Sequence, residues 1–390
     1  MIRARGGLTV GRAQRSIITG PRFTPIVTRL PSIVPFVAPE EIERSRGRPW
    51  AVRLGANELN CGPSPKAVAA MQSAAADSWM YGDPKSHELR AALAAHHGVQ
   101  PLNIVVGEGV DGLLNNVAHL LIGEGDSVVM SNGTYPTFGY FVAGRGGTVH
   151  TVPYGADDRH HLPSLIAKAA EVDAKAIYLV NPDNPSGTQH SAERIEMLVE
   201  MLPPSCVLIV DEAYFELGEE APQAAVDDLR VVRLRTFSKA YGLAGLRIGY
   251  AMGAPEIISS FDKIRNHFGV SRVAQAAALA ALGDHAYLAE VQERVRAARQ
   301  RLVAISGKYD LTPLPSATNF VTIDCGRDST FAKVVLTELH ERDVFVRMPG
   351  AAPLDRCIRV SCGMDADLDA FEKALPAALE AARRRSSLII

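Results

Sequence analysis

Hydrophobic residues in the middle of the chain gather in short runs that alternate with longer segments of helical pattern. The clearest runs are Ile104–Val106, Ser127–Met130, Ala176–Val180, Val207–Val210, Val231–Leu234 and Ile248–Ala251. Several lack polar alternation, which is typical of strands buried on both faces of a parallel sheet. Helical patterns between them cover Gly112–Leu121, Leu162–Ala170 and Glu193–Met201. The pattern predicts a doubly wound α/β fold with a mainly parallel sheet, without internal repeats.

The pattern changes after about Phe261. One long Ala/Arg/Glu-rich helix is predicted at Tyr287–Ile305, followed by short strands near Phe320–Ile323, Val344–Arg347 and Cys357–Val360 and a closing helix at Asp367–Arg383. This texture indicates a second, small α+β domain. We therefore expect an N-terminal arm over residues 1–30, a large domain over 56–262, a connecting segment over 263–284, and a small domain formed by 31–55 with 285–390.

Composition and charge narrow the possible classes of protein. The 390 residues suffice for one large and one smaller domain. A net charge of −2 gives no reason to expect nucleic acid or an anionic membrane as a partner. No apolar run approaches the roughly 18–20 residues that span a bilayer. Five scattered cysteines indicate neither a disulfide framework nor a metal site, which suits a reducing cytoplasm.

The first 39 residues contain six arginines, no lysine and no acidic residue. A transit peptide has a similar composition, although the apolar core of a secretory signal is missing. We favour the simpler interpretation, an arm that packs on a neighbour or stays mobile.

Residues that can bind a ligand or take part in catalysis follow four of the predicted strands. These segments are Gly107–Gly112, Asn181–Gly187, Asp211–Tyr214 and Thr236–Lys239. Ligands of open α/β sheets collect beyond the carboxyl ends of the strands. Each segment alone has an ordinary structural explanation, such as a turn, a helix cap or a surface Ser-Lys pair. Their occurrence together, in order and each at a strand end, favours one shared ligand site.

The residue types suit pyridoxal 5′-phosphate. That cofactor needs a lysine for its aldehyde, a carboxylate for its pyridine nitrogen, donors for its ring oxygen, and hydroxyls, an arginine and a helix start for its phosphate. Lys239, Asp211, Tyr214, Asn184, Thr236, Ser238, Arg247 and the Gly107–Gly112 loop supply that set. The loop also matches GxGxxG, so a dinucleotide is a rival ligand. The next strand, however, ends in Ser131-Asn132 rather than in the acidic residue such a site needs.

At this point the chain resembles a known family. The segment from Thr236 to Tyr250 is similar to the pyridoxal-phosphate lysine signature of fold-type I aminotransferases, and Asn181–Gly187 and Asp211–Tyr214 resemble two further signatures. Four other motifs are similar to the histidinol-phosphate aminotransferase branch: Asn57-Glu58, Gly62–Pro65, Tyr81–Pro84 and Arg359–Gly363. The resemblance runs from about Leu30 to Ala382, nearly the whole chain.

The resemblance implies roles at the cofactor. Lys239 would be the Schiff-base lysine and the base that moves the substrate proton, Asp211 would pair with the pyridinium nitrogen, and Tyr214 and Asn184 would bond the ring oxygen. Tyr135 would stack on the ring, unless it is only a core aromatic residue. The phosphate would be held by Thr236, Ser238, Arg247 and the N–H groups around Gly109, Val110 and Asp111. Tyr81 would reach the phosphate of a partner subunit, which implies a homodimer with shared sites.

At the substrate end the resemblance is less complete. Arg359 matches the family arginine that binds the substrate's anionic group, and Asn57 lies in the substrate motif. Arg347 matches a second arginine that suits a phosphate dianion, with a surface salt bridge as the equally weighted alternative. Phe36 stands where the family usually has a tyrosine that helps to hold the substrate phosphate. Leu59-Asn60 replaces the usual Asn-Pro.

The predicted function is therefore a pyridoxal-phosphate aminotransferase of the histidinol-phosphate type, exchanging amino groups between its donor and 2-oxoglutarate by a ping-pong mechanism. An aromatic or other α-amino-acid aminotransferase is the main alternative, favoured by Phe36. A lyase or decarboxylase acting on a phosphorylated amino acid is a third possibility. A cofactor-binding regulatory module would normally carry an added DNA-binding domain, which neither charge nor motif supports.

Overall fold

A computed structural model describes residues 21–32, 36–218 and 226–386 of the chain. Most of the predicted N-terminal arm, residues 1–20, lies outside the described residues. Its last part carries the short helix α1 (Pro25–Arg29), which Arg29 ties to Glu124 by an ion pair of 3.1 Å.

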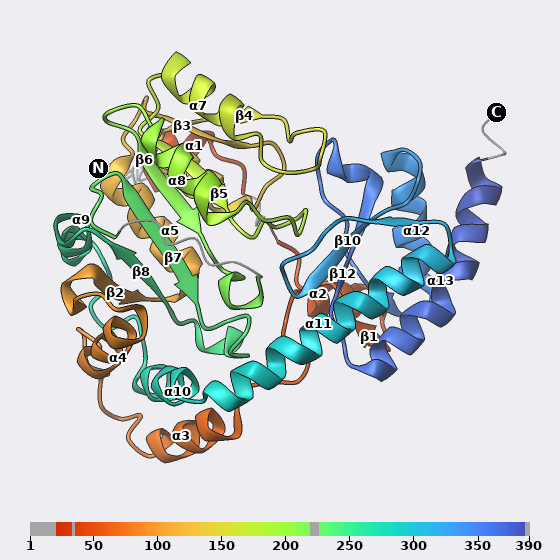
Figure 1. Cartoon of the computed structure of the whole chain (residues 1–390), viewed down its shortest axis with the longest axis horizontal. Coiled ribbons are helices and arrows are strands. Elements are labelled where there is room, and N and C mark those ends of the chain that lie inside the picture. The colour runs from red at the N-terminus through yellow and green to blue at the C-terminus, as the bar shows by residue number, and fades with distance from the viewer. Residues whose placement is uncertain (1–20, 33–35, 219–225, 387–390) are drawn as a thin grey trace, which may run out of the picture.

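A seven-stranded sheet forms the centre of the larger region (Figure 1). Its spatial order is β2-β8-β7-β6-β5-β3-β4, with every neighbouring pair parallel except those that involve β8. The strands are β2 (Ile104–Gly107), β3 (Ser127–Ser131), β4 (Thr148–Val152), β5 (Ala176–Val180), β6 (Val207–Asp211), β7 (Val231–Thr236) and β8 (Gly249–Gly253). The carboxyl ends of β5, β6 and β7 therefore meet at one edge of the sheet.

Helices cover both faces of this sheet. On one face α5 and α6 pack against Met130, Tyr178 and Ile209, and on the other α7 and α8 pack against Val129, Ile177 and Leu208. Successive strand residues point to opposite faces, so strands with a helix layer on each side are mostly apolar. In β7 the buried Arg233 and Arg235 are exceptions, and both pair with the buried carboxylate of Glu212. The helices of this region are α3 (Pro65–Ala75), α4 (His87–His97), α5 (Gly109–Leu121), α6 (Thr137–Gly144), α7 (Leu162–Glu171), α8 (Ala192–Glu200), α9 (Pro255–Ser260) and α10 (Arg272–Leu282).

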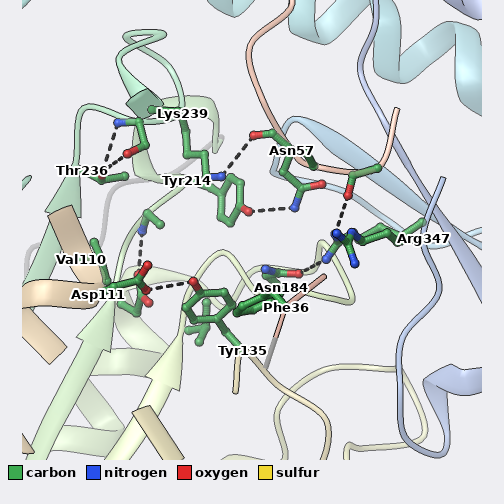
Figure 2. Close-up of a pocket in the computed structure, with 18 of the residues that line it drawn as sticks. Phe36, Asn57, Val110, Asp111, Tyr135, Asn184, Tyr214, Thr236, Lys239 and Arg347 are labelled. Atoms are coloured by element: carbon green, nitrogen blue, oxygen red, sulfur yellow. Dashed lines mark hydrogen bonds between the residues drawn. The ribbon is translucent and has the colours of Figure 1, made fainter. Parts of the chain in front are cut away.

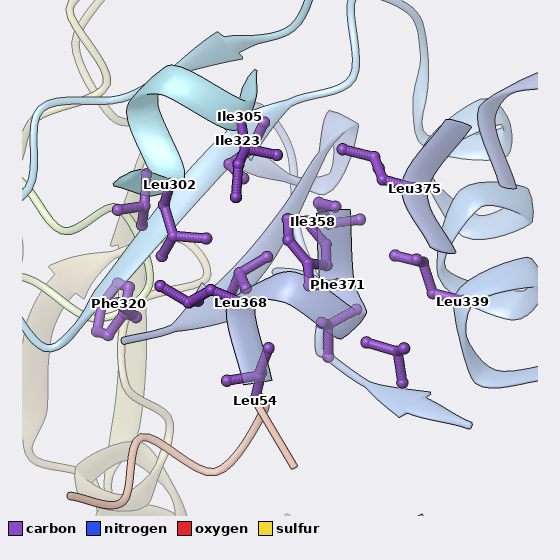
Figure 3. Packing of buried hydrophobic residues seen from close by; sticks show 14 of the residues in the cluster. Leu54, Leu302, Ile305, Phe320, Ile323, Leu339, Ile358, Leu368, Phe371 and Leu375 are labelled. Carbon is purple, nitrogen blue, oxygen red and sulfur yellow. The ribbon is translucent and has the colours of Figure 1, made fainter. Parts of the chain in front are cut away.

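A second region has its own sheet and core (Figure 3). Its antiparallel sheet has the order β12-β10-β9, formed by β9 (Thr312–Pro313), β10 (Phe320–Asp324) and β12 (Cys357–Ser361), and a separate parallel pair joins β1 (Val52–Arg53) to β11 (Val344–Phe345). The helices are α2 (Pro39–Arg46), α11 (His285–Lys308), α12 (Ser329–Glu341) and α13 (Asp365–Ser386). The long helix α11 runs from the first region to the second (Figure 1).

The predicted elements are present, with ends that differ by a few residues. Two differences have clear causes. Strand β4 was not predicted, because as an edge strand it buries only Val152 fully and contains His150 and two threonines. The strand predicted at Val344–Arg347 is shorter, and Arg347 instead forms an isolated bridge with Arg359. Within the described part of the chain no helix is long and apolar enough to cross a membrane.

Candidate active site

A cavity of about 360 Å³ opens where β5, β6 and β7 end (Figure 2). Pockets of this size are typical for cofactors and small substrates. Fourteen of the residues predicted from the sequence line it: Phe36, Asn57, Val110, Asp111, Tyr135, Asn184, Asp211, Tyr214, Thr236, Ser238, Lys239, Arg247, Arg347 and Arg359. The tertiary structure thus brings together residues that are more than 300 positions apart in the sequence.

Two predicted residues do not line this cavity. Gly109 starts α5 with a φ of +72°, and an added Cβ there would lie 2.8 Å from Nη2 of Arg247. Glycine at this position therefore lets the helix start approach the arginine. Tyr81 is 76% exposed and its ring lies 4.6 Å from that of Phe268. Within one chain, Tyr81 is a surface residue.

Lys239 is in the middle of the cavity. Its Nζ donates a hydrogen bond of 3.1 Å to the backbone oxygen of Asn57 and lies 5.5 Å from the ring centroid of Tyr214 (Figure 2). Burial, and then the positive charge of Arg359, lower the pKa of Lys239 to about 8. A lysine with that pKa is uncharged far more often at neutral pH than an exposed one, so it can act as a nucleophile and as a base.

Asp211 is the last residue of β6 and is buried beneath the same cavity. It accepts hydrogen bonds from the Tyr178 hydroxyl at 2.7 Å and from the Ala213 N–H at 3.1 Å. No ion pair within the described ranges involves it, and burial raises its pKa to about 7. A cationic ligand group in the cavity would compensate this carboxylate and lower its pKa again.

Tyr214 and Asn184 are held by hydrogen bonds from Asn57 and Arg359. The Tyr214 hydroxyl accepts a hydrogen bond of 3.0 Å from Nδ2 of Asn57, and burial raises its pKa to about 12. Asn184 accepts a hydrogen bond from Arg359. Asn57, predicted at the substrate, therefore also positions a residue predicted at the cofactor.

Near the first turn of α5, hydroxyl groups and the N-terminus of the helix form a polar part of the cavity. Thr236 donates to Ser238 at 2.9 Å, and Arg247 lies near the first turn of α5. Asp111 accepts a hydrogen bond of 2.9 Å from the Tyr135 hydroxyl and lies 3.6 Å from Arg247. Helix starts offer free N–H groups and a positive partial charge, so this combination favours an anion.

The predicted substrate end holds two arginines on neighbouring chain segments. Arg347 and Arg359 are opposite each other, with backbone hydrogen bonds of 3.2 Å and 2.6 Å. Burial lowers the pKa of Arg359 to about 10, and its Nε is buried without a hydrogen-bond partner. Nη2 of Arg347 donates to the backbone oxygen of Val37 at 2.6 Å. No acidic residue pairs with Arg347 among the described side chains, which argues against the salt-bridge alternative.

Phe36 and Tyr135 form an aromatic wall of the cavity. Their ring centroids are 5.6 Å apart and the rings are inclined by 27°, a stacked arrangement (Figure 2). Phe36 keeps 43% of its surface exposed and has no polar atom in its side chain. This side of the cavity therefore favours a flat apolar group.

Three supporting residues were missed from the sequence. Tyr178 holds Asp211, Ser361 donates to Oδ1 of Asn57 at 3.2 Å, and Asn319 donates to the Asn57 backbone oxygen at 3.0 Å. A tyrosine inside an otherwise apolar strand was a usable signal, because a buried hydroxyl needs a partner. Ser361 lies inside the Arg359–Gly363 motif, which did not indicate its partner, and Asn319 carries no signal in the sequence. Only the packing of the two regions brings both residues to Asn57.

Comparison with known proteins gives consistent results. The family model for aminotransferases of class I and II matches residues 51–375. Histidinol-phosphate aminotransferase of Moorella thermoacetica is 32% identical over 93% of this chain and 94% of its own length. An aromatic amino acid aminotransferase of Nocardia farcinica is 36% identical over 79% and 86%. The crystal structure of histidinol-phosphate aminotransferase from Sinorhizobium meliloti, in complex with pyridoxal 5′-phosphate, matches with a TM-score of 0.90 and 47% identity over 94% of this chain and 99% of that one.

Proposed function

The chain belongs to the class I and II aminotransferase family, and on that basis we propose that it transfers the amino group of histidinol phosphate to 2-oxoglutarate. Family membership makes it a pyridoxal-phosphate-dependent aminotransferase with a fold of type I, as predicted from the sequence. Its substrates are therefore an amino donor and a keto acid. The identity of that donor and the roles of individual residues are the proposal.

The cavity has groups that suit the cofactor at each of its ends. When bound, pyridoxal phosphate supplies an electrophilic aldehyde and a ring that accepts electrons. Asp211, buried without a cationic partner among the described residues, suits the pyridinium N–H, and the pocket of Thr236, Ser238, Arg247 and the α5 start suits the phosphate. Lys239 would then take the proton from the substrate Cα and return it to C4′ of the cofactor.

The paired arginines support a phosphorylated donor. Side chains at directly opposite positions of an antiparallel bridge point to the same side, so both guanidinium groups of Arg347 and Arg359 enter one part of the cavity. Arg347 lies close enough to Arg359 for its positive charge to help lower the pKa of Arg359. Two guanidinium groups with few competing acceptors suit a dianion better than a single carboxylate.

The aromatic wall supports a second candidate, an aromatic amino acid as donor. The Phe36 ring has no hydroxyl, stacks on Tyr135 and can also contact the ligand. The relative from Nocardia farcinica is named an aromatic amino acid aminotransferase. The imidazole of histidinol phosphate and the phenyl of phenylalanine are both flat rings. The two donors differ at the anionic end, a phosphate ester against a carboxylate, and in the two nitrogen atoms of the imidazole ring.

Rapid mixing of the holoenzyme with each donor would separate these candidates, because it follows conversion of the cofactor in the first half-reaction. We expect a higher kcat/KM for histidinol phosphate than for phenylalanine. Arg347→Gln should lower kcat/KM for histidinol phosphate by about tenfold or more, since each charged hydrogen bond contributes roughly 1.5–3 kcal/mol. It should affect phenylalanine less. Arg294→Gln, on the exposed side of α11, is the matched control. A higher kcat/KM for phenylalanine would favour the second candidate.

We also propose that the protein acts as a cytoplasmic homodimer with two domains. Separate hydrophobic cores in the larger and the smaller region support the proposed division into domains over 56–262 and over 31–55 with 285–390. The exposed rings of Tyr81 and Phe268, together with Trp79 at 81% exposure, form a surface that a second copy could cover. Analytical ultracentrifugation of the wild type and of Tyr81→Ala, with cofactor affinity measured in parallel, tests whether Tyr81 acts across the interface.

A further inference from the structure

A short segment joins the two arginines of the substrate end. Residues 348–356, here called the bridging segment, follow Arg347 and lead into β12, which carries Arg359. The two arginines are held together by backbone hydrogen bonds in both directions. Because each end of the bridging segment continues towards one of these arginines, its position influences where both guanidinium groups lie.

The bridging segment lies against the larger region, close to the main cavity. Asn132, which follows β3, donates from Nδ2 to the backbone oxygen of Ala352 at 3.3 Å. Gly133 has a φ of +84°, and an added Cβ there would lie 2.9 Å from the Cβ of Ala351. Glycine therefore permits a close approach of the segment two residues before Tyr135, which lines the cavity.

A small hydrophobic cluster adds a second contact between the segment and the larger region. Leu354 is 1% exposed and belongs to one buried cluster with Tyr154, from the loop after β4. Leu314 and Cys357 of the smaller region complete this cluster. The loop after β4 extends towards β10 and β12 (Figure 1). Tyr154 is itself fixed, because its hydroxyl donates to the buried carboxylate of Asp183 at 3.0 Å.

Arg356 ends the bridging segment and connects the two regions by charge. Its Nη2 donates to Oδ2 of Asp158, in the loop after β4, at 2.7 Å. Its Nε donates to Oδ2 of Asp324, the last residue of β10, at 2.6 Å. The Arg356 side chain keeps 28% of its surface exposed, and that of Asp158 only 16%. One guanidinium between two largely buried carboxylates forms a network, which contributes more than an isolated surface pair.

Asp158 gives this network a rigid anchor on the larger region. It lies in a tight turn, in which its N–H donates to the Gly155 oxygen at 3.0 Å and the Gly155 N–H donates to the Arg159 oxygen at 2.8 Å. The φ of Asp158 is +59°, a conformation that aspartate and asparagine adopt more readily than most residues. Hydrogen-bonded backbone therefore holds the carboxylate that Arg356 contacts.

We propose that Arg356 and Asp158 are positioning residues for the substrate's anionic group. Their ion pair holds the bridging segment on the larger region, which sets where Arg347 and Arg359 lie relative to the cofactor end. This role rests on the proposed function, in which both arginines bind the substrate. Neither Arg356 nor Asp158 is among the described residues that line the main cavity, so they act through the arginines.

Half-reactions of the holoenzyme test this role, because each gives a substrate dissociation constant and a maximal rate separately. Arg356→Gln and Asp158→Asn should weaken binding of the amino donor and of 2-oxoglutarate about three- to tenfold, part of the value of a charged hydrogen bond. Maximal rates should fall less than about twofold. The absorbance of the bound cofactor should stay the same, since the cofactor end is built on β6 and β7. Arg356→Lys keeps the charge and should restore part of the affinity.

Arg301→Gln is the matched control. The Arg301 side chain is also 28% exposed and pairs with Asp365 and Asp369, but both partners lie on α13 in the smaller region. Arg301→Gln should therefore lower the temperature of thermal unfolding about as much as Arg356→Gln does. It should leave both dissociation constants unchanged, because its ion pairs do not reach the larger region.

A double-mutant cycle shows whether the effect passes through the substrate arginines. In an Arg347→Gln background, Arg356→Gln should weaken substrate binding less than it does in the wild type, because one of the groups that it positions is already missing. Full additivity, dissociation constants that Arg356→Gln and Asp158→Asn leave unchanged, or an equal loss in Arg301→Gln would overturn the proposal. Each variant is compared with the wild type on whichever donor the wild type converts. A slow first half-reaction of the wild type with histidinol phosphate would contradict only the proposed donor.

Discussion

The two ends of the main cavity are built in different ways. At the cofactor end, Asp211 and the Thr236–Lys239 segment follow directly from β6 and β7, two paired parallel strands. At the substrate end, Phe36, Arg347 and Arg359 come from three segments that are distant in sequence and that meet only through tertiary contacts, such as the hydrogen bond from Arg347 to the Val37 oxygen.

This difference has a consequence for specificity. Groups at strand ends are held by the hydrogen bonds of the sheet, so their geometry tolerates little change. Groups supplied by separate segments can change one at a time, as Phe36 illustrates. We therefore expect substitutions at the cofactor end to abolish chemistry, and substitutions at the substrate end to change preference between donors.

The largest effect is expected for Lys239→Ala. Loss of both the covalent attachment point and the base should lower kcat by about 10⁴-fold or more. Single-turnover kinetics and the absorbance of the bound cofactor measure this. Lys333→Ala, at an exposed position of α12, is the control. Near-normal transamination by Lys239→Ala would contradict the assigned role.

The next largest effect is expected for Asp211→Asn, which keeps the shape of the side chain and removes its charge. We expect kcat to fall by about 10²–10³-fold, because the charge no longer stabilises a protonated ring nitrogen. The apoprotein should become more stable above pH 4. The folded-state pKa of Asp211 is raised to about 7 from an ordinary 3.8, so its ionisation costs stability as the pH rises between these values and the full cost persists above pH 7.

Tyr178→Phe separates these two effects, since it removes a hydrogen bond and leaves the charge. We expect a smaller loss of kcat than for Asp211→Asn. Thermal unfolding of apo and holo forms, measured beside kcat, provides the comparison. An equal loss of kcat in both variants would show that the hydrogen bond, rather than the charge, is what matters.

At the substrate end, Phe36→Tyr should shift preference rather than abolish activity. A hydroxyl at this position can donate to the phosphate of the donor, so kcat/KM for histidinol phosphate relative to phenylalanine should rise about tenfold. Phe23→Tyr, outside the cavity, adds the same hydroxyl at an exposed site and serves as the control. An unchanged ratio would mean that Phe36 does not reach the anionic end.

The smallest expected effect is the influence of Arg359, at the substrate end, on the pKa of Lys239 at the cofactor end. Uptake of pyridoxal phosphate by the apoprotein requires neutral Lys239, so its rate should rise with pH and level off above a midpoint near 8. Arg359 contributes to the lowered pKa of Lys239, and therefore Arg359→Gln should move this midpoint to higher pH. Stopped-flow absorbance measures the rate, with Arg294→Gln as the control. If the midpoint does not move, the charge of Arg359 at the substrate end does not influence the pKa of Lys239 at the cofactor end.

Much of the fold was predictable because local patterns agree with the tertiary structure. Bare apolar runs such as Ala176–Val180 and Val207–Val210 became central strands, since burial on both faces favours apolar residues at successive positions. The edge strand β4 was missed because four of its five residues are exposed or half-buried, and polar residues at these positions dilute the apolar signal. Most of the predicted cofactor residues, all except Gly109 and Tyr81, line one cavity because strand ends converge in any parallel sheet.

The sequence by itself therefore determined the fold class, the cofactor chemistry and the residues that follow the strands, because these depend on short segments and their order. Only the tertiary structure decided that Arg347 and Arg359 are opposite each other, and that Asn57 bonds Tyr214 and Lys239. Such contacts arise from the packing of two regions, and the free energy that selects them depends on residues far apart in sequence. No local pattern records them.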